Sequence, residues 1–380
     1  MLLVVLSIYP DTTQTSQQPM TAPKTAAPLR VLIPSWEVKV AGTAVPLLTG
    51  MDATFAVATR DGRITGHRLD TGERLWENDL ASPLAAPPLF IEGRLAVAIA
   101  GSPTSDITFL DPLTGLASSR VTLPATGHVA LSAVKSGLAV TGIFEGQPGV
   151  RLYDAKTGTL LWSSPLPSAA SAPVAQCSET ILVGAADGVL SALSAKDGSR
   201  QWIEKLPGAV TTPAVCDGRR AWIGSADNRI HALRMGRRNC RHLWSYPTGG
   251  DIAGRIILFN QRVSFFSYDT FLYSLAADNG HLQWKVRLGR RPQADSVLVG
   301  GLLVFAQLNT ERLELFSLAD GSQTASLTLA AGGERFVTPP ARAGRMVVIG
   351  AARYGEESAR IMGISPLLDP PPASSESTPR

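Results

Sequence analysis

The residues that could carry catalytic chemistry in this chain are few and far apart. The sequence has three cysteines and five histidines, and they form none of the common metal-binding motifs. The CxxC of zinc and thiol-redox sites is absent, and so are HxH and HExxH. A Gly-x-Ser-x-Gly elbow, a Walker loop and a strand-to-helix GxGxxG are also missing. We therefore expect no catalytic and no metal-ligating residues.

Two cysteines and two histidines have positions that each allow two interpretations. Cys177 and Cys216 lie 39 residues apart, close to the internal repeat length described below. They could be neighbours in a disulfide, but we favour burial as small apolar side chains. His67 and His231 follow an Asp-Gly or Asp-Asn turn in related repeat positions. They could face a common surface, but we favour ordinary strand residues.

The basic residues lack the pattern of a nucleic-acid binder, and for most of them we favour an ordinary solvated surface. The formal net charge is +4, and the arginines are scattered without the basic stripe and interleaved aromatics of a nucleic-acid binder. Two arginine doublets lie in loops that interrupt the repeat, GRRNCRH (236–242) and GRRPQAD (289–295). Rigid folds place function on such loops, so these arginines are the candidate partner-binding residues. They are Arg237, Arg238, Arg290 and Arg291.

An internal repeat predicts the architecture. LDTGERLW, YDAKTGTLLW, LSAKDGSRQW and LAADNGHLQW each place a tryptophan four residues after a turn glycine. The repeat glycines are Gly72, Gly158, Gly198 and Gly280, and the repeat tryptophans are Trp36, Trp76, Trp162, Trp202, Trp244 and Trp284. With Ser119 and Ala325 in the weaker copies, the position recurs every 40–43 residues. That period is the length of one four-stranded propeller blade.

Each interval contains the parts of a blade. Between Trp162 and Trp202, a short run of small residues precedes TILVGAA and VLSALSA, which flank Asp187-Gly188. Asp-Gly between two apolar runs predicts a hairpin, for which we expect a type I′ turn. The large flat tryptophan at the end of each blade is expected to pack against the neighbouring blade.

The ends of the chain predict how the ring closes. Three strands follow Ala325, and a fourth is supplied by Trp36-Glu37-Val38-Lys39-Val40 from the N-terminal end. We expect an all-β, eight-bladed propeller of four-stranded antiparallel blades over residues 31–367. Residues 368–380 are expected to form a disordered tail.

The first 30 residues have the composition of a leader and a linker. MLLVVLSIY has the length of a signal-peptide apolar region but lacks a positive start, and a Thr-, Gln-, Pro- and Ala-rich stretch follows. We interpret 1–30 as a truncated export signal and flexible linker; a plain disordered leader is the alternative. No apolar run reaches 18 residues, so we expect no transmembrane span.

The repeat resembles that of the pyrroloquinoline quinone (PQQ) propeller family, with its Ala-x-Asp-x-x-Thr-Gly-x-x-x-Trp core. The matching residues in YDAKTGTLLW are Asp154, Thr157, Gly158 and Trp162. The family includes the quinoprotein alcohol and glucose dehydrogenases and the BamB-like propellers, which are non-enzymatic scaffolds for outer-membrane barrel assembly. The resemblance implies this fold and one of these two functions.

The chain is more similar to the BamB-like branch. The dehydrogenases are much longer, hold PQQ against a disulfide of adjacent cysteines and ligate calcium with Glu, Asn and Asp. This chain has no Cys-Cys pair, and its aspartates mostly occupy turns. We expect no PQQ and no calcium, and a non-enzymatic scaffold with protein partners in the bacterial periplasm or at the outer-membrane periphery. A PQQ-dependent dehydrogenase and a ligand-binding or sensory propeller are the alternatives.

Overall fold

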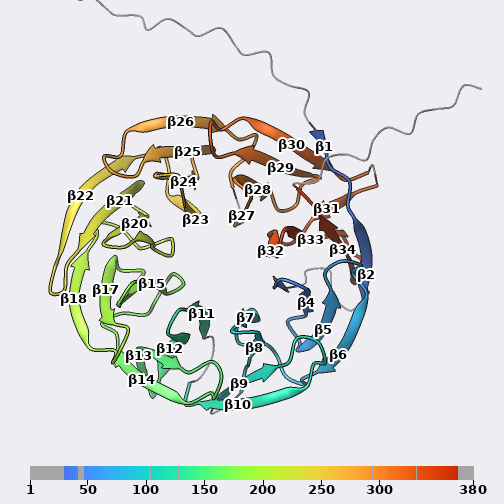
Figure 1. The fold of residues 1–380 in the computed structure, drawn as a ribbon, viewed down its shortest axis with the longest axis horizontal. Coiled ribbons are helices and arrows are strands. Elements are labelled where there is room, and N and C mark those ends of the chain that lie inside the picture. The colour runs from blue at the N-terminus through green and yellow to red at the C-terminus, as the bar shows by residue number, and fades with distance from the viewer. Residues whose placement is uncertain are drawn as a thin grey trace, which may run out of the picture.

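The structure is a closed ring of eight small β-sheets around a central axis (Figure 1). This computed structural model describes residues 30–41, 47–101, 104–125, 129–292, 295–330 and 332–366. The eight-bladed all-β propeller predicted from the repeat is therefore confirmed. The predicted leader and linker, apart from Arg30, and the predicted tail lie outside the described residues. Over the described residues, no helix is long and apolar enough to cross a membrane.

The first four blades follow one another along the chain, each from the innermost to the outermost strand. Blade 1 contains β3 (Leu47–Gly50), β4 (Thr54–Ala58), β5 (Arg63–Arg68) and β6 (Arg74–Asp79). Blade 2 contains β7 (Leu89–Ile91), β8 (Arg94–Ile99), β9 (Ser105–Leu110) and β10 (Ala117–Leu123). Blade 3 contains β11 (Ala130–Val134), β12 (Gly137–Phe144), β13 (Gln147–Tyr153) and β14 (Leu160–Pro165). Blade 4 contains β15 (Ala175–Cys177), β16 (Thr180–Gly184), β17 (Val189–Ser194) and β18 (Arg200–Lys205).

The last four blades complete the ring. Blade 5 contains β19 (Val215–Asp217), β20 (Arg220–Ser225), β21 (Arg229–Met235) and β22 (Cys240–Pro247). Blade 6 contains β23 (Ile252–Phe259), β24 (Arg262–Ser267), β25 (Phe271–Ala276) and β26 (Leu282–Arg287). Blade 7 contains β27 (Val297–Val299), β28 (Leu302–Ala306), β29 (Arg312–Ser317) and β30 (Gln323–Thr328), with β1 (Arg30–Val31) outside β30. Blade 8 contains β31 (Glu334–Phe336), β32 (Ala341–Ala343), β33 (Met346–Arg353), β34 (Ser358–Ile364) and β2 (Trp36–Ala41).

Burial explains why the inner strands and the outer strands have different sequence patterns. The second and third strands of a blade are covered on both sides by the neighbouring blades, so they are almost continuously apolar, as in β4 (TFAVA), where every residue is buried. The fourth strands lie on the circumference and alternate between exposed and half-buried residues, as in β26 (LQWKVR). Only one side of each outer strand therefore contributes to the core.

The predicted hairpins are present, but their turns differ from the expected type. In blade 4, Gly188 N donates to Ala185 O (3.0 Å), and Gly188 has a φ of 88°. Asp187 is not among the positive-φ residues, whereas a type I′ turn requires positive φ at both central positions. The expected type I′ turn is therefore wrong: the hairpin has an ordinary turn followed by one left-handed residue, which adds a bulge and increases the local twist.

The repeat tryptophans pack on the turn glycine of the next blade. Trp36, from blade 8, lies over Gly72 of blade 1, and a Cβ built on Gly72 would come within 2.6 Å of the indole ring. Gly72 also has a φ of 76°, so both its backbone and its neighbour require glycine. The same contact joins Trp76 to Gly115, Trp162 to Gly198, Trp244 to Gly280 and Trp284 to Gly321. Each of these contacts buries one blade's outer strand against the next blade's turn.

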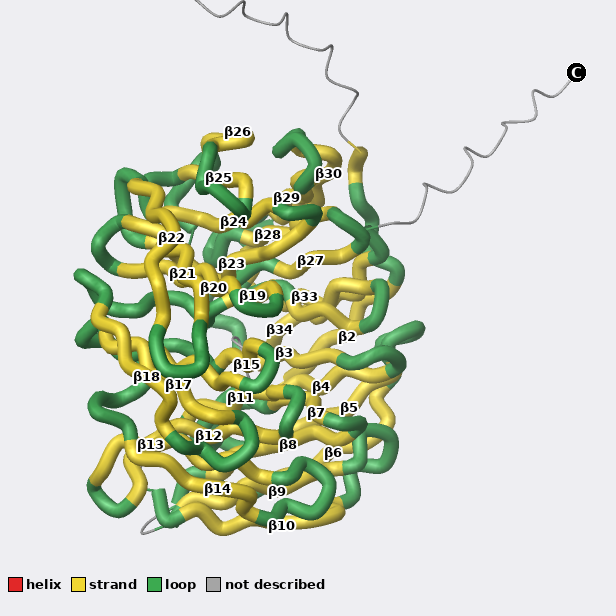
Figure 2. The backbone as a smooth tube through the Cα atoms, turned by 60° about the vertical axis from the view of Figure 1, so that its left-hand side comes forward, coloured by secondary structure: helices red, strands yellow, loops and turns green. Residues whose placement is uncertain are grey.

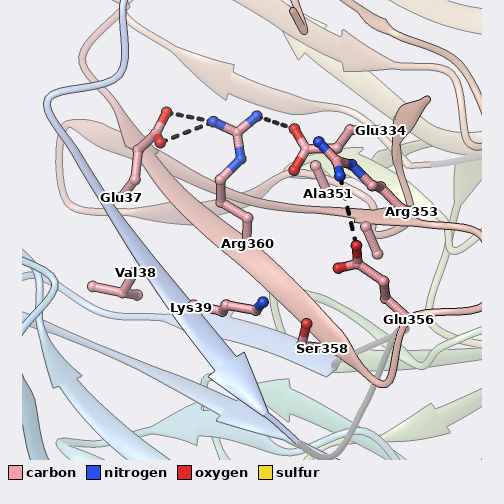
Figure 3. A pocket seen from close by; sticks show the side chains of 10 residues that line it. Glu37, Val38, Lys39, Glu334, Ala351, Arg353, Glu356, Ser358 and Arg360 are labelled. Carbon is pink, nitrogen blue, oxygen red and sulfur yellow. Dashed lines mark hydrogen bonds and ion pairs between the residues drawn. The ribbon is translucent and has the colours of Figure 1, made fainter. Parts of the chain in front are cut away.

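The ring closes through the N-terminal strand, as predicted. β2 pairs antiparallel with β34, from Trp36↔Gly363 to Ala41↔Ser358. Arg360 of β34 donates two hydrogen bonds of 2.8 Å to Glu37 of β2 and another to Glu334 of β31, so one guanidinium connects three strands (Figure 3). These residues line a polar cavity of about 390 Å³ with Arg353 and Glu356. The charged groups of this cavity bind one another, and the ion pairs of Arg360 hold the N-terminal strand β2 in the last blade, where the ring closes.

A second N-terminal strand was not predicted from the sequence. β1 pairs in parallel with β30, Arg30 with Ala325 and Val31 with Ser326. Leu32, which is 3% exposed, packs in the same apolar cluster as Ala325, which occupies the position of the tryptophan in the strong repeats. Blade 7 therefore has an added fifth strand at its outer edge.

Consecutive strands within a blade are antiparallel, so the loops at their ends, green in Figure 2, lie alternately on two opposite faces of the ring. The turn face, as we call it, carries the turns between first and second strands and between third and fourth strands. The linker face carries the turns between second and third strands and the links to the next blade. Hydrogen bonds join neighbouring loops on each face, for example Met235 N to Arg219 O (2.7 Å) on the turn face and Leu288 N to Thr270 O (2.8 Å) on the linker face.

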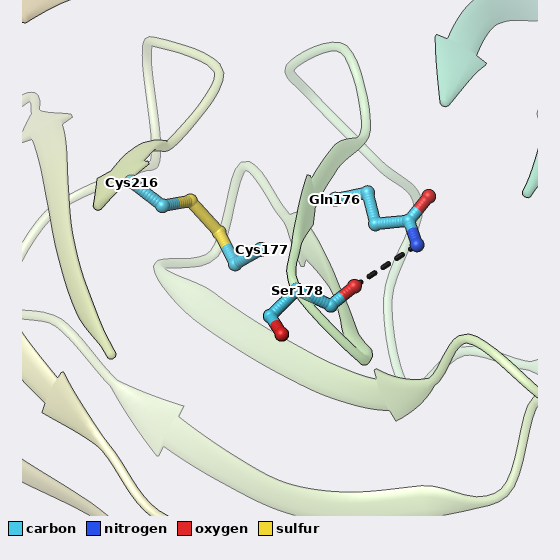
Figure 4. The surroundings of a disulfide bond; sticks show 4 residues. All are labelled: Gln176, Cys177, Ser178 and Cys216. Atoms are coloured by element: carbon cyan, nitrogen blue, oxygen red, sulfur yellow. Dashed lines mark hydrogen bonds between the residues drawn. A yellow bond between two sulfur atoms is a disulfide. The ribbon is translucent and has the colours of Figure 1, made fainter. Parts of the chain in front are cut away.

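A disulfide joins blades 4 and 5 near the centre of the ring. Cys177 in β15 and Cys216 in β19 have a Cα–Cα distance of 5.7 Å and are covalently linked (Figure 4). The favoured interpretation of two separate apolar thiols is thus wrong, because β15 and β19, the first strands of neighbouring blades, lie next to each other and bring the two cysteines together. Cys240 remains a free thiol.

Candidate functional site

The structure separates the four candidate arginines onto opposite faces. Arg237 and Arg238 lie between β21 and β22, on the turn face of blade 5. Arg290 and Arg291 lie in the link from β26 to β27, on the linker face. They cannot form one binding site, although the sequence grouped them by type.

The turn-face pair is at the tip of a basic hairpin. The turn is closed by Gly236 N donating to Asn239 O (2.8 Å), and Arg237 and Arg238 are both exposed. Below the tip, Arg234 of β21 pairs directly with Arg241 of β22, and both are exposed. Arg219 is exposed in the adjacent turn of the same blade. We call Arg219, Arg234, Arg237, Arg238 and Arg241 the basic hairpin cluster.

The linker-face pair is more engaged with its own surroundings. The guanidinium of Arg291 lies over the ring of Tyr268, 4.0 Å from its centroid, a cation–π contact. The backbone oxygen of Arg290 accepts a hydrogen bond from Gln307 Nε2 (3.2 Å). In the same region Arg255 and Asp295 form an ion pair (3.6 Å). Several polar and charged groups of this region therefore already have partners within the protein, and fewer of them are free to bind another protein.

The first strands of the blades surround a central cavity of about 760 Å³. Its lining is mostly apolar, and includes Leu48, Leu89, Leu131, Ile257 and Leu298, together with several prolines. The charged residues in the lining are Arg255, Asp295 and Arg342. Ser296 also lines it; this residue is 4% exposed and its hydroxyl has no hydrogen-bond partner.

This cavity does not fit PQQ and calcium. PQQ is a flat anion with several carboxylates, and a calcium ion takes six to eight oxygen ligands. The only carboxylate among the cavity-lining residues is Asp295, which is paired with Arg255. Across the described residues, no three His, Cys, Asp or Glu side chains converge as a metal site would require. The disulfide links cysteines of two blades rather than adjacent residues, so it also differs from the dehydrogenase pattern.

The two histidines in related repeat positions are buried structural residues. His67 is hydrogen-bonded to Gly72 O (3.0 Å) and Thr65 Oγ1 (2.9 Å) and stacks on Phe55. His231 Nε2 contacts the Asp227 carboxylate (3.0 Å). Burial is the largest influence on the pKa of both rings and lowers it, because the charged imidazolium is disfavoured away from water. Neither side chain reaches a surface that the two could share.

The comparisons with known proteins agree with the repeat. The chain matches the family of outer membrane protein assembly factor BamB over residues 33–115, 103–324 and 207–356, which together span nearly the whole ring. The protein belongs to this family. Among curated proteins, no sequence matches it.

Solved structures show the same fold as this BamB family member at low sequence identity. BamB from Moraxella catarrhalis has 13% identity and a TM-score of 0.65, covering 87% of this chain and 99% of that one. The computationally designed Ika8 protein has 14% identity and a TM-score of 0.70, with the same coverage. The C-terminal WD40 domain of Sif2 has 9% identity and a TM-score of 0.70, covering 88% and 99%. At these identities the likeness concerns the fold alone.

Sequence reasoning found two of the five residues in the basic hairpin cluster. It missed Arg219, Arg234 and Arg241, because the doublet at 237–238 was read as a loop feature rather than as part of a blade. The signal that could have found them is density: seven arginines occur between positions 219 and 241. With the strand register, that density predicts a basic surface on one blade.

Proposed function

We propose that this protein is a non-enzymatic scaffold of the bacterial cell envelope that assists the assembly of outer-membrane β-barrel proteins. The observation that carries the proposal is the match to the BamB family along nearly the whole ring. A scaffold needs surfaces that hold partners in a fixed orientation, and a closed ring with its loops on two faces supplies them. The protein's partners in this role are other envelope proteins.

The rigidity of the ring supports this role. Tryptophan-on-glycine contacts join most neighbouring blades, a disulfide joins blades 4 and 5, and the Arg360 cluster closes blade 8. Loops on such a frame keep their relative positions when a partner binds, so little ordering entropy is lost. The central cavity lacks the carboxylates that calcium would need, which supports a role without quinone catalysis.

The disulfide supports a location outside the cytoplasm. Disulfides between structural cysteines persist in oxidising compartments such as the bacterial periplasm and are rare where thiols are kept reduced. The pair Cys177–Cys216 joins separate blades and one of its members is buried, which is typical of a structural bond. The bond therefore supports the proposed location in the periplasm or at the periphery of the outer membrane.

The first test is crosslinking of the tagged protein in its native envelope, followed by identification of the captured proteins. We expect an outer-membrane assembly protein, with crosslinks concentrated on one face of the ring. Capture of no assembly protein would contradict the proposal. A parallel dehydrogenase assay with added PQQ and calcium should show no dye reduction above that of the cofactors alone.

The apolar central cavity favours a second candidate function, the binding of a small apolar ligand. Its support is the volume of about 760 Å³ and the buried, unpartnered hydroxyl of Ser296. Native mass spectrometry of protein purified from its own envelope tests this directly. A stoichiometric small molecule that is lost when Ile257 is replaced by Arg would establish a ligand-binding propeller instead.

A further inference from the structure

We propose that the basic hairpin of blade 5, together with the free edge of β22, binds an extended acidic segment of a partner protein. The inference rests on the scaffold function proposed above and names the surface and the chemistry of the segment that it takes. Four observations support it: unpaired charge, engaged local carboxylates, contrast with the other blades, and an open strand edge.

The cluster concentrates positive charge without internal compensation. Within the described part of the chain, none of its five arginines forms an ion pair. Arg234 and Arg241 are directly opposite one another across β21 and β22, an arrangement in which like charges repel. An anionic partner would relieve this repulsion, so the arrangement stabilises the complex at the expense of the unbound protein.

The carboxylates around the cluster are already bound to other groups. Blade 5 contains two acidic residues, Asp217 and Asp227. Asp217 accepts from Arg220, and Asp227 contacts the ring of His231. Glu204, from the neighbouring strand of blade 4, accepts a hydrogen bond from the Cys240 thiol (3.2 Å). Blade 5 itself therefore offers the cluster no free carboxylate.

The same turn in six other blades carries an aspartate instead of arginines. The turns between third and fourth strands of six blades contain an aspartate, namely Asp70, Asp111, Asp154, Asp197, Asp278 and Asp320. Blade 5 alone among blades 1–7 has Gly-Arg-Arg-Asn there. A flat anionic surface such as a membrane would meet all these carboxylates as it approached the turn face. A narrow acidic segment can contact blade 5 and avoid the rest, so a peptide is the partner that fits.

The edge of β22 offers the backbone groups that such a segment needs. In the sheet of blade 5, β22 is the last strand and pairs only with β21. At eight residues it is the longest fourth strand in the ring. The ring accepts an added strand at such an edge, because β1 pairs with β30 in this way. Backbone pairing would provide affinity, and carboxylates beside Arg241 and Arg238 would fix the register.

The test uses the full-length protein and a defined probe. The probe is a fluorescein-labelled peptide of about nine alternating Glu and Thr residues, a length that matches one strand. Its controls carry Lys in place of Glu, or N-methyl groups on alternate backbone nitrogens. The variant R237E/R238E is compared with R290E/R291E, which makes the same change in net charge on the opposite face.

We expect R237E/R238E to weaken peptide binding by about tenfold or more, and R290E/R291E to change it by less than about twofold. Binding should fall when NaCl rises from about 0.05 M to about 0.5 M, since exposed charges are screened. The N-methylated peptide should bind more weakly than its parent. Equal losses in both variants, undiminished binding of the N-methylated peptide, or equal binding of the Lys peptide would each overturn the inference.

Two further measurements separate this inference from its rivals and from the proposed function. If phosphatidylglycerol vesicles bind the protein and R237E/R238E abolishes that binding while the peptide fails to bind, the partner is a membrane and the inference is wrong. A photocrosslinker at Asn239 is compared in the envelope with one at Tyr354 on the linker face. Capture of an assembly protein at Tyr354 but not Asn239 preserves the scaffold function and overturns the inference. If the peptide binds but no assembly protein is captured at any position, the surface binds an acidic segment and the proposed scaffold function is wrong.

Discussion

The turn of blade 4 and the hairpin of blade 5 occupy the same place in the repeat and are built for different tasks. In blade 4, Asp197 accepts hydrogen bonds from Ser199, Gly198 is left-handed, and Trp162 of blade 3 covers the turn. In blade 5, two exposed arginines occupy the turn, and Trp202 donates a hydrogen bond to Gly236 O (3.1 Å) and packs in one cluster with Leu233 and Met235 rather than over a turn glycine. The comparison teaches that a repeat position can be released from stabilising the ring, which leaves it open to the binding role proposed above.

The boundary between blades 4 and 5 has a substitute for the missing contact. Where the other strong repeats place a tryptophan over a turn glycine, this boundary has the disulfide Cys177–Cys216 at the inner strands. A covalent bond near the channel holds the two blades together without using the turn face. The hairpin of blade 5 is therefore free to vary in sequence.

The largest effect should come from breaking a regular boundary. Trp162 is 7% exposed and packs on Gly198, so Trp162→Ala removes a buried aromatic ring and leaves a cavity. We expect a loss of about 3–5 kcal/mol in the free energy of unfolding, measured by urea denaturation. A loss below about 1 kcal/mol would show that the boundary is not where the ring gains its stability.

A glycine pair tests the turn itself. A Cβ at Gly198 would lie 2.5 Å from Trp162, whereas one at Gly218 would have no atom within 4 Å, although both glycines have positive φ. Gly198→Ala should therefore destabilise the protein more than Gly218→Ala. Equal losses would assign the effect to backbone strain alone.

The next largest effect should come from the disulfide. Replacing both Cys177 and Cys216 by Ala is expected to cost about 2–4 kcal/mol in the free energy of unfolding, because the bond restricts the unfolded chain. Dithiothreitol should lower the wild-type melting temperature and leave that of the double variant unchanged.

Cys240→Ala is the control for the disulfide experiment. Burial, together with Glu204, raises the pKa of the Cys240 thiol to about 12, so this thiol stays protonated and is a poor nucleophile for exchange. The variant should keep the wild-type response to dithiothreitol. A Cys240→Ala protein that no longer responded would mean that this thiol participates in the bond.

The fold was predictable because the repeat carries its own register. Trp36 falls in frame with the other tryptophans, and this position alone identifies β2 as the closing strand. β1 was not predictable, because Arg30 and Val31 have no repeat frame and their partner Ala325 lacks the tryptophan that marks the position. The separation of 39 residues, close to the repeat length, put Cys177 and Cys216 on the first strands of neighbouring blades, but spacing alone does not distinguish a bond from two neighbouring thiols.

The candidate site was only partly predictable. Arg237 and Arg290 have similar local sequences, GRRN and GRRP, and only the alternation of strands places them on opposite faces. The pairing of Arg234 with Arg241 depends on the hairpin register, which is altered by the bulge between Ala232 and Leu233. Long-range geometry of this kind is not contained in composition or motif.

A smaller effect should separate the two kinds of turn by their response to acid. The hydroxyl and backbone NH of Ser199 bind the Asp197 carboxylate and lower its pKa from 3.8 to about 2. Its contribution to stability is therefore present above pH 3.8 and is lost as the pH falls toward 2. Asp197→Asn should make the stability curve shallower in this window, measured by urea denaturation at each pH. Arg238→Gln, in the hairpin of blade 5, should leave the slope there unchanged, and a change equal to that of Asp197→Asn would erase the distinction between the turns.

The smallest effect has the most informative sign. Arg241→Glu converts the repulsion with Arg234 into an attractive cross-strand pair, which should raise the free energy of unfolding by about 0.2–1 kcal/mol. Added NaCl should stabilise the wild type relative to this variant, because salt screens repulsion in one and attraction in the other. The same substitution should weaken binding of the acidic peptide. A variant that is more stable and binds less would show that the hairpin keeps the Arg234–Arg241 repulsion because both arginines serve partner binding. A less stable variant would mean that Arg241 contributes to the fold of blade 5.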